Sequence, residues 1–370
     1  MVPSESVALV KPATRRIPRP GASLPPLRGY NPVDIVALIY LGITSLLLLA
    51  HPGRLPWYYL AIHLALTAGV ALLRLIPHLG RFPLQFLRES YPLWMLPLAY
   101  SELDMLNRLA ASRYYDDVVL AWDRAIFGLH PHLLLSQWIP IPAVSEVLHA
   151  SYLIYALLTP ILGLTLYFQG RPEAFRVFAT TVGLCMYGAY LVFIFFPVQG
   201  PWYGTSDATQ GFFSGIVDQY LTRGSARGTA FPSSHVAGAV VVAAMARWFS
   251  RRLSWFMIGL AASISIATVY GGFHYAIDAV AGLGWGLAIA ALGPRVHAGL
   301  LRQHRLPHIR LRFPHLRIRS GQLRVVPDSL PAPTPAPTPA AGDTREGPDE
   351  AGSPGGADHR QRAQHPGGVG

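Results

Sequence analysis

The chain has 370 residues, of which 51% are hydrophobic and only 13% are charged; its formal net charge is +11 and its mean hydropathy is +0.33. Several apolar runs approach the roughly 20 residues that a helix needs to cross a bilayer, so the composition indicates a polytopic membrane protein rather than a soluble one. Cys185 is the only cysteine, which excludes an intrachain disulfide.

The chain begins with a stretch rich in proline and basic residues that shows no helical period. We expect residues 1–32 to form a disordered basic arm in the cytoplasm. The positive charge of such an arm favours contact with a bilayer that contains anionic lipids.

Eight apolar segments are expected to cross the membrane within a transmembrane domain at residues 33–293. They are 33–50, 57–76, 91–109, 144–168, 175–196, 236–249, 255–270 and 275–292. The third is the weakest, because two prolines, Glu102 and Asp104 interrupt it, and a polar residue within a bilayer needs a protein partner. The expected fold class is therefore all-α, a polytopic membrane helical bundle with about eight transmembrane helices.

Beyond the last apolar segment, residues 294–326 are rich in Arg, His and Leu and form a basic juxtamembrane segment, either interfacial or simply solvated. Residues 327–370 contain Pro-Ala-Pro-Thr repeats and Gly-rich sequence that cannot bury a core, so we expect a disordered tail.

Basic residues gather on alternate loops of this eight-helix arrangement, and acidic residues gather on the others. The basic loops mark the cytoplasmic side of the membrane. We therefore expect a multi-pass protein of the cell membrane with both termini in the cytoplasm. His235 and His274 then lie at the extracytoplasmic face.

Two short motifs place polar residues at the edges of apolar segments. In residues 231–235 (FPSSH), proline suits the first turn of a helix and either serine can cap its free N–H groups; a helix N-terminus also favours a phosphate. In residues 274–278 (HYAID), residues four apart share a helix face, so Asp278 can hydrogen-bond His274 and raise its basicity. The pattern favours phosphoryl transfer, with His274 as a candidate nucleophile.

The chain between the two motifs supports bringing them together. A helix from His235 to about Phe249, a short turn and a helix over 255–270 have legs of similar length. The chain therefore returns to the level that it left, where Gly271 and Gly272 break the helix and His274 opens the next one.

The two motifs resemble the second and third signature blocks of the type-2 phosphatidic acid phosphatase superfamily. More narrowly, residues 196–203 (FPVQGPWY) resemble the inositol phosphorylceramide synthase branch, an inositolphosphotransferase group with bacterial relatives, and residues 122–128 (WDRAIFG) resemble a loop of the bacterial members. The resemblance covers roughly residues 91–292. Within it, Gln199, Trp202 and Tyr203 either line a lipid entrance or belong to an aromatic belt at the interface.

The resemblance implies a six-helix phosphatase-type core and a covalent phosphohistidine intermediate. In that scheme His274 attacks phosphorus, Asp278 supports it and His235 protonates the leaving alkoxide. Ser233, with the backbone N–H groups from Ser234 onward, holds the phosphoryl oxygens. Water or another alcohol then takes the phosphoryl group.

The chain departs from the superfamily pattern in its positive charges. The first block, Lys-x6-Arg-Pro, is not found before the serine–histidine motif, and Thr268 stands where an arginine is expected. The synthase-like branch tolerates such a threonine. Ser234 stands where the commoner form of the serine–histidine block has a glycine. Arg223 and Arg227 are the nearest residues that could neutralise a bound phosphate; the alternative is that these two arginines face lipid headgroups.

The sequence thus predicts a membrane lipid phosphatase or phosphotransferase, with transfer of an inositol-phosphate-type headgroup as one outcome. We expect a lipid phosphate as substrate, no nucleic-acid partner, no cofactor and no metal. Two alternatives stay open: a non-catalytic lipid-binding protein, which the missing basic residues favour, and a metal-dependent membrane hydrolase, although neither motif has a third ligand at metal spacing. The other histidines of the membrane domain are interpreted as interfacial: His51, His63, His78, His130, His132 and His149.

Overall fold

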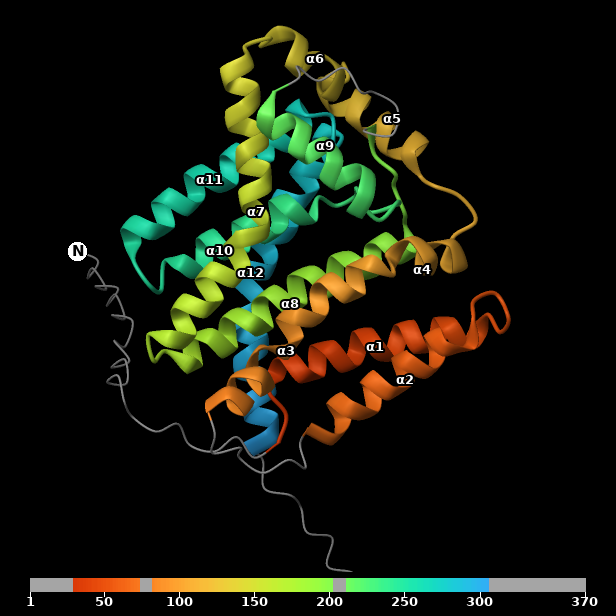
Figure 1. Cartoon of the computed structure of the whole chain (residues 1–370), viewed down its shortest axis with the longest axis vertical. Coiled ribbons are helices and arrows are strands. Elements are labelled where there is room, and N and C mark those ends of the chain that lie inside the picture. The colour runs from red at the N-terminus through yellow and green to blue at the C-terminus, as the bar shows by residue number, and fades with distance from the viewer. Residues whose placement is uncertain (1–28, 74–81, 202–210, 306–370) are drawn as a thin grey trace, which may run out of the picture. The chain divides into compact units, whose positions relative to one another are not determined.

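The computed structural model describes residues 29–73, 82–201 and 211–305, and these ranges are helical, with one isolated bridge between Val198 and Thr229 (Figure 1). The expected all-α class is confirmed. The helices are α1 (Pro32–Ala50), α2 (Trp57–Leu72), α3 (Phe82–Ser101), α4 (Leu103–Ala110), α5 (Asp116–Phe127), α6 (Pro131–Trp138), α7 (Pro142–Phe168), α8 (Pro172–Phe195), α9 (Phe212–Gly224), α10 (Ser234–Ala246), α11 (Arg251–Tyr270) and α12 (Ala276–Arg305).

Five helices of the described ranges are long and apolar enough to cross a membrane: α1, α7, α8, α11 and α12. Helices α2 and α10 are apolar but shorter, at 16 and 13 residues. These helices agree with a polytopic helical membrane protein. The expected tail at 327–370 and most of the expected arm and juxtamembrane segment lie outside the described residues, whereas α12 continues through Pro294 to Arg305.

The expected single segment at 91–109 is wrong, because α3 ends at Ser101 and α4 begins at Leu103. Glu102 lies at the break, and its Oε2 is 2.8 Å from Nε2 of the buried His63 on α2. This contact gives an acidic side chain the protein partner that it needs in an apolar setting. The break therefore coincides with the polar residue that made the segment doubtful.

Helix α8 is the most buried of the five candidate spans, because 72% of its apolar stretch is buried within the protein. It packs against α1, α10 and α12. Helix α10 packs against both α11 and α12. Two glycines of α12 allow its close approach to α10, because a Cβ on Gly282 would overlap the Ser233 carbonyl and one on Gly286 would lie 2.7 Å from the Ala237 carbonyl. Small residues serve this purpose in many membrane helix pairs.

Three short helices, α5, α6 and α9, contact the ends of the long helices, and we call them the cap helices (Figure 1). Helix α5 contacts α12, α6 contacts α11 and α9 contacts α7. The hairpin of α10 and α11 returns the chain to this same region, as its sequence predicts. Helices α5 and α6 thus contact the two helices that flank the turn carrying His274.

Candidate active site

The serine–histidine motif forms the start of α10. Ser233 is the N-cap residue, and its Oγ accepts a hydrogen bond from the Val236 N–H at 3.4 Å. Its own N–H donates to the Asp278 carbonyl at 3.0 Å, which ties the start of α10 to the first turn of α12. Ser233 and Ser234 are both buried. The predicted helix start is therefore present, with Ser233 engaged as its cap.

The second motif forms a turn before α12. The Thr268 carbonyl accepts hydrogen bonds from the N–H groups of Phe273 and His274, both at 3.0 Å, and Gly272 has a φ of 67°, which favours glycine. Thr268 thus shapes the turn that presents His274, at a position where the superfamily pattern has an arginine.

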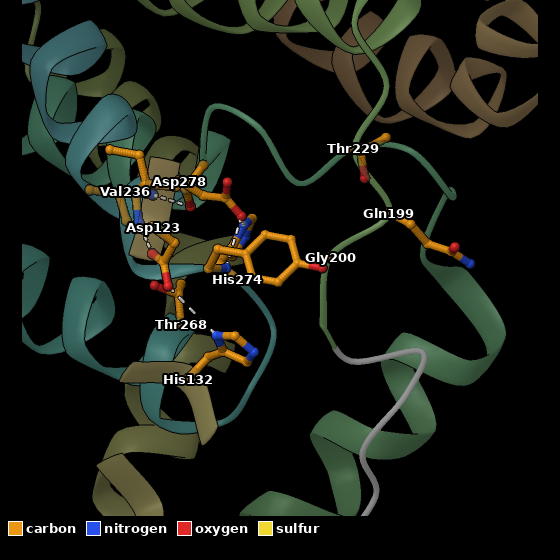
Figure 2. Close-up of polar contacts among 12 residues, drawn as sticks. Asp123, His132, Gln199, Gly200, Thr229, Val236, Thr268, His274 and Asp278 are labelled. Atoms are coloured by element: carbon orange, nitrogen blue, oxygen red, sulfur yellow. Dashed lines mark hydrogen bonds and ion pairs between the residues drawn. The ribbon is translucent and has the colours of Figure 1, made fainter. Parts of the chain in front are cut away.

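The expectation that His274 and Asp278 share a helix face is wrong, because α12 begins only at Ala276. The turn brings the two side chains together instead: His274 Nδ1 lies 3.4 Å from Asp278 Oδ2, an ion-pair distance without hydrogen-bond geometry (Figure 2). The same Oδ2 accepts a hydrogen bond from the Tyr275 N–H at 2.9 Å. Asp278 therefore both caps α12 and faces the imidazole of His274.

The two histidines meet in one cavity. Their ring centroids are 5.8 Å apart, and within the described ranges neither Nδ1 atom has a hydrogen-bond partner. His274 is buried and His235 is half-buried. The other cavity-lining residues are Tyr100, Tyr152, Gln199, Tyr220, Leu221, Ser225, Thr229, Ala230 and Phe273.

Aromatic residues of α7 hold His235, and the sequence did not point to them. Tyr152 stacks on the His235 ring at 4.7 Å between centroids and Tyr155 lies at 4.5 Å. The Tyr155 hydroxyl also donates to the Ser234 carbonyl at 3.2 Å. Because Tyr155 precedes Ser234 by 79 residues, no local pattern could have connected them.

A loop that leads to the cavity is anchored by the first cap helix. Asp116, at the start of α5, accepts hydrogen bonds from the N–H groups of Gln199 and Gly200 at 3.0 and 2.9 Å and from the Tyr275 hydroxyl at 3.0 Å. Gln199 consequently lines the cavity. Trp202 and Tyr203, the other two residues considered for a lipid entrance, lie outside the described residues.

The predicted phosphate-binding arginines have a different placement. Arg223 lies in the last turn of α9 and Arg227 in the loop that follows, and both are exposed. Neither lines the cavity; among the residues that the structure describes, its lining contains hydroxyl, amide and imidazole groups but no Lys or Arg. Neutralisation of a phosphate by these two arginines stays a prediction.

Three further polar side chains come together beside the His274 turn. Asp123 on α5 is fully buried, and its Oδ1 accepts a hydrogen bond from the Ile277 N–H at 2.9 Å (Figure 2). Its Oδ2 lies 3.8 Å from His130 Nδ1 and 3.9 Å from His132 Nδ1. Burial raises the pKa of the Asp123 carboxyl, and burial together with the neighbouring His130 lowers the pKa of His132 to about 4.

The interpretation of the remaining histidines as interfacial is wrong for three of them, because His63, His132 and His149 are buried. Two of these rings pair with a polar group of the protein, His63 with Glu102 and His149 Nδ1 with the Ser145 carbonyl at 2.7 Å, whereas His132 only faces Asp123 at 3.9 Å. Such partners allow a histidine to be buried, because a buried polar group is costly only when it is unpaired.

Residues 117–292 match the family model of the PAP2 superfamily. The matched segment contains the serine–histidine motif, His274 and Asp278, as the resemblance of the two motifs led us to expect. Together with the apolar helices, the match indicates a membrane phosphatase. The chain has no significant match among curated proteins or solved structures.

Proposed function

We propose that the protein is an integral membrane phosphatase or phosphotransferase that acts on a lipid-linked phosphate through a phosphohistidine on His274. The observation that carries this proposal is the convergence of His235 and His274, from motifs about 40 residues apart, in one cavity with Asp278 beside His274. The family match supports the reaction class.

In the first half-reaction, His274 is the nucleophile. Its Nδ1 faces Asp278, which orients the ring and leaves Nε2 to attack phosphorus. The new N–P bond forms as the P–O bond to the leaving group breaks. His235 gives its proton to the departing alkoxide and becomes neutral.

In the second half-reaction, neutral His235 takes a proton from an acceptor hydroxyl group. The acceptor oxygen attacks phosphorus, the N–P bond breaks and His274 is regenerated. Water as the acceptor gives a phosphatase, and an alcohol gives a phosphotransferase. Because both reactions share the first half-reaction, their difference lies in which acceptor occupies the cavity.

The cavity lining supports a singly charged phosphodiester whose headgroup is a polyol. Tyr100, Gln199, Tyr220, Ser225 and Thr229 offer hydroxyl and amide groups that suit neutral polar ligands. The N-terminus of α10 supplies partial positive charge for the phosphoryl oxygens. The absence of Lys and Arg from the described lining disfavours a doubly charged phosphomonoester, so transfer of an inositol-phosphate-type headgroup is the favoured form of the reaction.

Arg223 and Arg227 have a role outside the cavity in this proposal. Their exposed positions next to cavity-lining Tyr220, Leu221, Ser225 and Thr229 suit attraction of an anionic headgroup before it enters. Replacing both by Gln should raise KM more than it lowers kcat, and should make KM less sensitive to salt.

The test is incubation of the purified full-length protein with labelled lipids that carry a phosphomonoester, a pyrophosphate or an inositol phosphodiester, with and without added inositol and other polyols. Product analysis should show a phosphoryl product whose yield depends on the acceptor, and His274→Ala should form none. Binding without turnover of any lipid would favour the non-catalytic alternative. Turnover that survives in His274→Ala would refute the proposal.

The site is proposed to face the extracytoplasmic side, with both termini in the cytoplasm, because of the distribution of basic residues among the loops. A reporter fused after Pro327 should then be cytoplasmic, and a tag inserted near Asp207 should be accessible from outside the cell. A C-terminal reporter on the outer side would contradict this orientation.

A further inference from the structure

The start of α6 directs two histidines towards the aspartate of α5. Helix α5 ends at Phe127, and its C-cap residue Gly128, with a φ of 69°, reverses the chain; α6 begins at Pro131, three residues after Gly128. His130 is the N-cap residue of α6 and His132 lies in its first turn. Their Nδ1 atoms lie 3.8 and 3.9 Å from the same carboxylate oxygen, Asp123 Oδ2.

None of these three atoms has a hydrogen-bond partner within the part of the chain that the structure describes. Asp123 is 0% exposed and His132 is 8% exposed, so water reaches neither side chain freely. A buried carboxylate oxygen and a buried ring nitrogen that face each other unpaired are costly. The arrangement therefore calls for a ligand that all three atoms can share.

We propose that Asp123 Oδ2, His130 Nδ1 and His132 Nδ1 bind one divalent transition-metal ion, with zinc as the best fit. Two imidazole nitrogens and one carboxylate oxygen are a common zinc ligand set, with solvent completing the tetrahedron. Magnesium and calcium prefer sites made of oxygen atoms. One ligand atom from each of the three residues lies within 4.8 Å of the other two.

The spacing is close to that of a bound ion. Atoms that each lie about 2.1 Å from one zinc ion are at most about 4.2 Å apart, and the two Asp123 contacts are shorter than this limit. The His130 side chain is 34% exposed, so it can adjust its ring and also leaves a route by which an ion reaches the site. A small contraction of the cluster completes the coordination.

The site is supported on both sides. Asp123 Oδ1 accepts a hydrogen bond from the Ile277 N–H at 2.9 Å, which orients the carboxylate. The His132 ring packs edge-on against Tyr275, with 5.0 Å between the ring centroids. Ile277 and Tyr275 lie between His274 and Asp278 in the chain. The proposed ion thus braces the turn that presents the catalytic histidine, as a positioning site outside the cavity itself. Binding does not depend on the proposed reaction.

The test compares the metal content and thermal stability of the full-length protein purified with a tag that contains no histidine. The variants are Asp123→Asn, which keeps the volume and the acceptor for the Ile277 N–H, and His130→Ala, which removes the most exposed ligand. The matched control is His51→Ala, a histidine at the end of α1 that lies outside the cluster. Each protein is treated with a chelator, dialysed and titrated with zinc alone, and then with magnesium alone.

We expect the wild-type protein and His51→Ala to bind about one zinc ion more per chain than Asp123→Asn and His130→Ala, a difference that removes any contribution from histidines elsewhere. Zinc should raise the melting temperature of the first pair only, and magnesium should raise none. Equal zinc content and equal thermal shifts in all four proteins would overturn the proposal, as would a wild-type protein that binds no zinc. If one variant fails to fold, the other still decides the outcome.

Discussion

The structure contains two clusters that each have two histidines and one aspartate. His235, His274 and Asp278 form one at the cavity, and Asp123, His130 and His132 form the other on the cap helices, which we call the cap cluster. Both contact the segment that contains Tyr275 and Ile277, and they differ in where their ring nitrogens point. In the cavity, only His274 faces Asp278, at 3.4 Å, while His235 lies across at 5.8 Å between ring centroids. In the cap helices, His130 and His132 both direct Nδ1 at one oxygen of Asp123. The same residue types therefore support different chemistry.

Because the two clusters have the same residue types, their composition does not distinguish a candidate nucleophile from a candidate metal site. The distinguishing feature is whether several lone pairs point at one position. A nucleophile needs one ring nitrogen free to reach phosphorus, and His274, whose Nδ1 faces Asp278, lines the cavity. A metal ion needs several lone pairs aimed at one point, which the cap cluster offers. The alternative of a metal-dependent hydrolase placed the ion on His235, His274 and Asp278, whereas we propose an ion beside them.

The largest expected effect is that of His274→Ala. Loss of the nucleophile should lower turnover by at least about 10⁴-fold, roughly 5.5 kcal/mol of transition-state stabilisation, while the protein stays folded in detergent. Steady-state rates and size-exclusion profiles of the two proteins provide the measurement. If His274→Ala kept activity within tenfold of wild type, His274 would not be the nucleophile, and the two clusters would no longer differ in their proposed roles.

The second effect is that of His235→Ala, and it depends on the leaving group. A general acid contributes about 10²–10⁴-fold when the leaving group is a poor one such as an alkoxide. The variant should therefore lose most activity on a lipid phosphate but keep much of it on an activated aryl phosphate. The informative quantity is the ratio of the two rates in each protein, and an equal loss on both substrates would mean that His235 is not the acid.

The third effect tests the packing that joins the motifs. A methyl group on Gly282 would overlap the Ser233 carbonyl, so Gly282→Ala should lower stability by about 1–3 kcal/mol and disturb the start of α10. Gly284→Ala is the matched control, because no atom lies within 4 Å of its added Cβ. Melting temperatures in detergent compare the two variants, and equal values would argue against close contact between α10 and α12 here.

The smallest effect is that of Asp123→Asn on catalysis. If the cap cluster only supports the turn, the variant should lose no more than about 10–100-fold in kcat, in keeping with the effect of a supporting residue. It should still form the phosphorylated enzyme, unlike His274→Ala. A loss as large as that of His274→Ala, measured on a folded protein, would instead give Asp123 a part in the chemistry.

The sequence predicted the parts of the fold that depend on local pattern. The helical class, the helix start at Ser233 and the return of the chain from His235 to His274 follow from apolar runs, a proline–serine pair and legs of similar length. It failed where a turn replaced a helix: His274 precedes α12, and its contact with Asp278 arises from backbone hydrogen bonds to Thr268.

Contacts between distant segments were beyond the reach of sequence patterns. Tyr152 and Tyr155 meet His235 from α7, and Asp123 meets Ile277 from α5, with no spacing that marks either contact. The His130-Pro131-His132 spacing was a visible signal, but its meaning depends on the reversal at Gly128 that turns both rings towards Asp123. Such convergence is a property of tertiary structure.

The central claim is that His274 carries the phosphoryl group, and the direct measurement is to trap it. The protein is mixed with a phosphorus-labelled lipid substrate, quenched within the first turnover under alkaline conditions that preserve phosphohistidine, and digested for mass spectrometry. We predict a phosphoryl group on His274, with the headgroup still attached when the donor is a phosphodiester, that is lost on acid treatment and is absent from His274→Ala. In His235→Ala it should accumulate when the donor has an activated aryl leaving group, because that group departs without an acid whereas transfer to a poor acceptor still needs His235 as the base. Turnover without any covalent phosphate, or with the phosphate on another residue, would contradict the account.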